Sequence, residues 1–179
     1  YVPSRGAIIN PTITVADKLV CFVESRNPAT RQNATGRVPL QTLLTEGADL
    51  VAVDLKSGEV VWRSDFALTR AEHHLYLCYA RGKLVAVGTR NQGQGNKGTV
   101  YYEVHAYDVG NGSLKWRVSQ NQREKTGGSH GEQDHHPVIV GQTVYVEPYA
   151  YDLQSGVRRP DWLLRRGGHG CGTMSASAK

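Results

Sequence analysis

Methionine is nearly absent from this 179-residue chain, and long apolar runs are missing. One methionine and few helix-forming runs argue against a helical bundle. No stretch approaches the roughly 20 apolar residues that a membrane-spanning helix needs, so we expect no transmembrane segment. The 20 glycines and 7 prolines instead indicate a chain with many turns.

Cysteine is also scarce, and its spacing matches no common metal motif. Cys21, Cys78 and Cys171 form neither a Cys-x-x-Cys pair nor a zinc-binding spacing. Cys21 and Cys78 lie in strand-like runs, where we expect buried free thiols. Cys171 lies in a glycine-rich segment.

The formal net charge of +5 raises the question of an anionic partner. Lysine and arginine are mostly scattered along the chain, and no nucleic-acid-binding motif accompanies them. We therefore expect no nucleic-acid partner, and we interpret the single basic cluster as a solvated edge. The cluster consists of Arg158, Arg159, Arg165 and Arg166.

A short motif recurs three times along the chain. Residues 51–62 and 104–116 both contain apolar-x-Asp-apolar-x-x-Gly-x-apolar-x-Trp, with eight residues from the aspartate to the tryptophan. A looser copy begins at residue 150 and reaches its tryptophan after two extra residues, around Arg159-Pro160. The motif positions are Asp54, Gly58 and Trp62, then Asp108, Gly112 and Trp116, then Asp152, Gly156 and Trp162.

Each motif copy has the chemistry of a β-hairpin. The aspartate side chain can accept bonds from backbone N–H groups two residues on, and glycine tolerates a positive φ. Alternating apolar residues flank the turn on both sides, as they do in paired strands. The tryptophan is large enough to fill the space between neighbouring sheets.

A second hairpin precedes each motif copy, within residues 7–23, 74–88 and 137–147. Two hairpins per unit give four strands, and the tryptophans are spaced 54 and then 46 residues apart. Four-stranded units at this spacing are typical of a β-propeller. We therefore expect an all-β fold of four-stranded antiparallel blades, in about three blades. Their expected bounds are about 6–66, 72–119 and 135–172, with the start of a further strand at 173–179.

The motif resembles the tryptophan-docking repeat of quinoprotein dehydrogenases, which use pyrroloquinoline quinone (PQQ). It is equally similar to the repeat of their cofactor-free relatives, including the propeller lipoprotein of the bacterial barrel-assembly machinery. The resemblance implies that the motif tryptophans dock against neighbouring repeats as structural residues. It also implies a ring of seven or eight blades and a periplasmic or extracellular location. Because three blades cannot close a ring, we expect the remaining blades of the same propeller as partners.

Three segments are longer than a blade requires, and loops carry the function in propellers. They span residues 27–49, 91–98 and 121–136. We expect a short helix near residues 40–44 in the first. The third is rich in histidine and acidic residues, which could bind a divalent metal; the alternative is that these side chains satisfy turns at the start of a blade. The candidate ligands are His130, His135 and His136, to which His169 and Cys171 could add.

Three functions are compatible with this sequence. We favour a non-catalytic scaffold that presents loops to a protein or another macromolecule, and we assign no catalytic residue. A fragment of a PQQ-dependent dehydrogenase would need PQQ with calcium, yet the chain has neither the adjacent-cysteine pair nor the calcium motifs that the resemblance implies. A metal-associated exported propeller is the third reading, and it has no Cys-x-x-Cys-His haem motif to support it.

Overall fold

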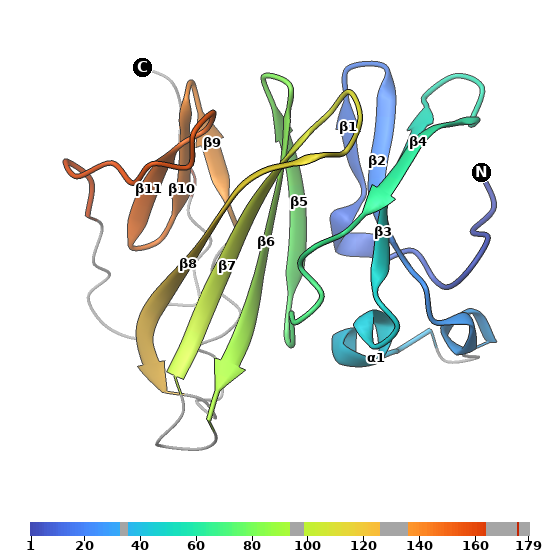
Figure 1. The fold of residues 1–179 in the computed structure, drawn as a ribbon, viewed down its shortest axis with the longest axis horizontal. Helices are drawn as coiled ribbons and strands as arrows, with labels where there is room; N and C mark the ends of the chain where they lie inside the picture. The colour runs from blue at the N-terminus through green and yellow to red at the C-terminus, as the bar shows by residue number, and fades with distance from the viewer. Residues whose placement is uncertain (33–35, 94–98, 126–135, 164–174, 176–179) are drawn as a thin grey trace.

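The computed structural model describes residues 1–32, 36–93, 99–125, 136–163 and 175, without the side chains of 122–125. Its strands form three antiparallel sheets that stand side by side, as a succession of propeller blades does (Figure 1). The predicted all-β fold and antiparallel blades are therefore confirmed. The expected further strand at 173–179 lies outside the described residues, apart from Ser175.

The first sheet contains four strands, hydrogen-bonded in chain order. Two 3-10 helices and one α-helix flank these strands, and the α-helix is the one predicted near residues 40–44. The strands are β1 (Thr14–Ala16), β2 (Leu19–Ser25), β3 (Ala48–Asp54) and β4 (Val60–Asp65). The helices are η1 (Asn10–Thr12), η2 (Pro28–Gln32) and α1 (Leu40–Leu44).

The second sheet also has four strands in chain order, and its strands are longer. They are β5 (Leu75–Ala80), β6 (Lys83–Gln92), β7 (Thr99–Asp108) and β8 (Leu114–Lys125). Its third and fourth strands form the second motif hairpin, so that Ala106 lies opposite Trp116. Ala52 lies opposite Trp62 in the same way in the first sheet.

The third sheet differs from the four-stranded prediction, because the described residues contribute three strands to it. They are β9 (Val138–Val140), β10 (Thr143–Val146) and β11 (Tyr149–Asp152). After the motif turn the chain pairs with β11 at a single bridge, between Tyr151 and Arg158. Pro160 follows two residues later; it lacks the N–H that a ladder requires, so pairing does not continue there.

The motif turns have the predicted chemistry in all three sheets. Asp54 accepts hydrogen bonds from the backbone N–H groups of Lys56 and Ser57. Asp108 and Asp152 make equivalent bonds in their own turns. Gly58, Gly112 and Gly156 have φ values of 71°, 70° and 71°, which only glycine adopts without strain.

Antiparallel pairing places the turns that follow β1, β3, β5, β7, β9 and β11 at one end of the sheets, which we call the turn end, while the two-residue turn between β10 and β11 lies at the opposite end. The connections that leave β2, β4, β6 and β8 all lie at the other end, which we call the loop end (Figure 1). The three long segments identified in the sequence therefore leave the sheets on the same side of the molecule. Helix α1 belongs to this end.

Two apolar layers hold the three sheets together. The layer between the first and second sheets includes Leu50, Phe66 and Tyr107, and the rings of Phe66 and Tyr107 stack at 5.6 Å. The layer between the second and third sheets includes Val87 and Val144. Burial of these side chains is the main stabilising contribution to blade stacking.

Candidate functional site: blade junctions and the loop end

The tryptophan of the first blade reaches into the motif turn of the second. Its Nε1 donates a hydrogen bond to the carbonyl oxygen of Val109, at 2.9 Å. Ser64, two residues later in β4, donates from its hydroxyl to the carbonyl oxygen of Gly112 at 3.0 Å. A Cβ on Gly112 would lie 2.5 Å from Cζ3 of Trp62, so the turn accommodates the indole only because this residue is glycine.

The second junction repeats the same geometry. Nε1 of Trp116 donates to the carbonyl oxygen of Leu153 at 3.0 Å. A Cβ on Gly156 would lie 2.6 Å from Cδ2 of Trp116. In both junctions the acceptor follows the motif aspartate directly and the contacted residue is the motif glycine. We infer that the motif residues are structural and join consecutive blades.

The remaining motif residues have different surroundings. Trp162 lies outside a strand and packs edge-on against Tyr145, with ring centroids 4.7 Å apart. Its buried Nε1 has no hydrogen-bond partner among the described residues. Gly58 has the backbone nitrogen of Tyr1 as its neighbour, 3.3 Å from the position of a Cβ.

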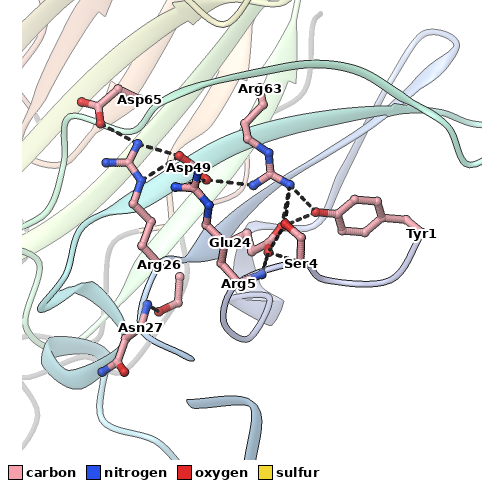
Figure 2. A network of polar contacts seen from close by, with 10 residues as sticks. Tyr1, Ser4, Arg5, Glu24, Arg26, Asn27, Asp49, Arg63 and Asp65 are labelled. Atoms are coloured by element: carbon pink, nitrogen blue, oxygen red, sulfur yellow. Dashed lines mark hydrogen bonds and ion pairs between the residues drawn. The ribbon is translucent and has the colours of Figure 1, made fainter. Parts of the chain in front are cut away.

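A network of charged side chains crosses the loop end of the first blade (Figure 2). Arg26, just after β2, bonds to Asp49 in β3 at 2.6 Å and to Asp65 at the end of β4 at 2.8 Å. Three strands are thereby tied together where the 27–47 connection leaves the sheet. We call the triplet of Arg26, Asp49 and Asp65 the first staple.

The second blade has a matching staple. Arg90 bonds to Glu103 at 2.6 Å, and Glu103 also accepts a hydrogen bond from Ser119 at 2.9 Å. Asp49 and Glu103 occupy equivalent positions, because each stands five residues before its motif aspartate. In the strand register, Asp49 lies opposite Asp65 and Glu103 lies opposite Ser119. Each staple thus links neighbouring strands of its blade at the point where a loop-end connection leaves the sheet.

Two acidic side chains of the first blade are buried and ionised. Burial acts to raise the pKa of Asp49, but hydrogen bonds from Arg26 and Arg63 outweigh it and hold that pKa below its ordinary value. The pKa of Glu24 is also lowered, because hydrogen bonds from Tyr1 and Arg5 together with Arg63 overcome its burial. Arg63 joins the two carboxylates, at 2.8 Å from Asp49 and 3.1 Å from Glu24.

The same network holds residues 1–5 on the first sheet. The backbone N–H groups of Ser4 and Arg5 donate to Oε1 of Glu24 at 2.9 and 2.8 Å. The hydroxyl of Tyr1 donates to the same carboxylate, and its ring packs on Phe22 with centroids 5.1 Å apart. The carboxylate of Glu24 is thus fully occupied by protein donors.

The connection that carries α1 is fixed to the sheet by further bonds. Nδ2 of Asn27 donates a hydrogen bond to the carbonyl oxygen of Thr42 at 3.0 Å. The hydroxyl of Ser25 donates one to the carbonyl oxygen of Leu43. Leu44 is buried in the layer between the first and second sheets. Helix α1 therefore has a defined position at the loop end.

Two open grooves lie between consecutive blades. The groove between the first and second blades has a volume of about 440 Å³ and is lined by α1, the linker between the blades and the end of β6. The groove between the second and third has a volume of about 520 Å³ and lies beside β8. Representative lining residues are Gln41, Thr69, Arg70 and Arg90 in the first, and Gln120, Tyr149 and Arg158 in the second.

The predicted metal ligands fall mostly outside the described residues: His130, His135, His169 and Cys171 are not described. His136 is described, and its ring lies 3.7 Å from that of Tyr76, centroid to centroid. Within the described residues, no three histidine, cysteine, aspartate or glutamate side chains gather as a metal site requires. Cys21 is a buried free thiol, and Cys78 is free and partly buried.

Sequence reasoning missed the staples and the grooves. The staples had a signal in the sequence, since an acidic residue stands five residues before the aspartate in all three motif copies, at Asp49, Glu103 and Glu147. The grooves had none, because their lining residues come from separate blades.

Comparison with known proteins identifies the repeat. Residues 34–160 match the PQQ_2 family, described as outer membrane protein assembly factor BamB. The chain belongs to this family. The suspected resemblance to PQQ-like repeats is thereby confirmed. Among curated proteins, none matches the chain.

A solved structure shares the fold. BamB from Moraxella catarrhalis is 12% identical and superposes with a TM-score of 0.50, over 86% of this chain and 37% of that one. At this identity the likeness concerns the fold alone. This chain thus spans about a third of the length of that BamB. The helices of the described part are too short to cross a bilayer.

Proposed function

We propose that this chain is part of a non-catalytic propeller scaffold that acts in the assembly of outer membrane proteins and binds a protein partner at its loop end. The supporting observation is the match of residues 34–160 to the outer membrane protein assembly factor family. In this proposal the remaining blades of the ring stack beside the first and third sheets. The scaffold works on the periplasmic side of a bacterial outer membrane.

The arrangement of the loop end supports its role as the binding face. Both inter-blade grooves are open, whereas the described turn end carries tight turns. The staples tie the strands together at the base of the connections. A partner therefore meets a surface that is already ordered, which lowers the entropic cost of association.

Site-specific photo-crosslinking in the full-length protein tests this proposal. A photoreactive amino acid replaces Gln41 or Thr69 at the loop end, and Lys56 or Gln154 at the turn end as matched exposed controls. We expect covalent adducts with an envelope protein from the first pair and none from the second. Adducts from the turn end alone would refute the assignment of the face, and the absence of adducts from both ends would refute the scaffold role.

A further inference from the structure

We propose that the groove between the second and third blades binds an acidic side chain of an extended protein segment, with Arg158 as the recognising group. This inference rests on the proposed function, because it names the chemistry of the partner. The groove has a volume of about 520 Å³, and its described lining residues include one cation and no acidic residue. The charge of the lining therefore favours a carboxylate.

Arg158 is held ready for such a ligand. Its guanidinium carbon lies 3.6 Å from the ring centroid of Tyr149, which is a close cation–π contact. Within the described part of the chain, no carboxylate pairs with it, whereas the adjacent Arg159 is bound to Asp152 at 3.7 Å. Stacking fixes the plane of the guanidinium, and a planar fork donates two parallel bonds to a carboxylate.

The floor of the groove is polar but already satisfied. Nε2 of Gln120 donates to the carbonyl oxygens of Val146 and Glu147 at 3.1 and 2.8 Å. Its Oε1 accepts a hydrogen bond from the hydroxyl of Tyr151 at 2.5 Å. The floor is therefore rigid and uncharged, so that among the described lining residues Arg158 is the one cation that complements a negative ligand.

The groove suits an extended segment better than a compact molecule. One of its walls is β8, which is the outer edge strand of the second sheet. Glu103 of the neighbouring strand β7 contacts Ser119 and is paired with Arg90 at 2.6 Å. Among the described lining residues of the groove, a partner segment therefore meets no acidic side chain beside Arg158.

A direct binding measurement tests the inference. A dye-labelled peptide of alternating glutamate and serine, blocked at both ends, is titrated against the full-length protein and followed by fluorescence anisotropy at low salt. The matched probe has glutamine in place of glutamate. We expect the glutamate peptide to bind about tenfold more tightly, which corresponds to about 1.4 kcal/mol.

Three variants localise the effect. Arg158→Gln should abolish the preference for glutamate, and Arg158→Lys should restore it only in part, because an ammonium cannot form the paired bonds. Arg81→Gln, at an exposed arginine of the turn end that lines neither groove, should bind like the unmodified protein. Equal binding of the two peptides, or equal losses from Arg158→Gln and Arg81→Gln, would overturn the inference.

The two proposals fail separately. If loop-end crosslinks from Gln41 are found and no glutamate preference is seen, only the assignment of this groove is wrong. If the glutamate preference is seen and crosslinks are absent, the groove binds acidic peptides and the proposed scaffold role is wrong.

Discussion

Adding one methyl group at a blade junction should destabilise the protein far more than adding it at an open turn. In Gly112→Ala the new Cβ meets Ser64 and Cζ3 of Trp62, the latter at 2.5 Å. A φ of 70° adds backbone strain of about 1–2 kcal/mol for alanine. Overpacking adds about 1–3 kcal/mol, so the total loss should be about 2–5 kcal/mol.

Gly141→Ala provides the matched control. Gly141 has a φ of 60° and no atom within 4 Å of the position of its Cβ, so only the backbone strain of about 1–2 kcal/mol applies. Urea unfolding followed by circular dichroism measures both variants, and Gly112→Ala should have the lower midpoint. If Gly112→Ala fails to fold while Gly141→Ala folds, the reasoning also holds. Equal midpoints would refute it.

Three other predictions concern buried polar groups. Trp116→Phe removes the hydrogen bond to the Leu153 carbonyl and should reduce the free energy of unfolding by about 1–3 kcal/mol. Trp162→Phe should reduce it less, because Nε1 of Trp162 has no partner among the described residues. Equal losses for the two variants in urea titrations would contradict this. Asp49→Asn breaks the first staple and should lower stability by about 3 kcal/mol. The native pKa of Asp49 is depressed. The contribution of this carboxylate to the free energy of unfolding is therefore present above the unfolded pKa of about 3.9 and is lost as the pH falls through the native pKa. Asp49→Asn should accordingly flatten the acid limb of a stability–pH profile. Burial, helped by the positive charge of Arg117, lowers the pKa of His105 to about 4. The NMR signals of its ring should therefore report a neutral imidazole at about pH 5. A titration midpoint near about 6.5 would contradict its burial.

The repeat and its hairpins could be predicted because their determinants are local. The aspartate caps the turn and glycine adopts a positive φ within five residues, whatever the rest of the fold does. The short helix at residues 40–44 could be predicted for a similar reason, since it directly follows Pro39. Periodic spacing of such units was then enough to indicate the propeller.

The features that the sequence did not reveal are non-local. The first staple joins residues 26, 49 and 65, and no local preference requires these three charges to meet. The third sheet was expected to have four strands because its motif is nearly intact, yet Pro160 ends the pairing with β11 after one bridge. The proline is visible in the sequence, and its missing N–H explains why a fourth strand does not form beside β11 in the described residues. The metal hypothesis depends chiefly on residues outside the described part.

The docking of Trp62 and Trp116 onto the next blade is the central feature of this structure. Nuclear Overhauser contacts in the full-length protein test this directly, with selectively labelled tryptophan and glycine. The indole rings of Trp62 and Trp116 should show contacts to the α-protons of Gly112 and Gly156, and their Nε1 protons should exchange slowly because both are hydrogen-bonded. Indole protons that exchange freely and show no contact to either glycine would contradict the account.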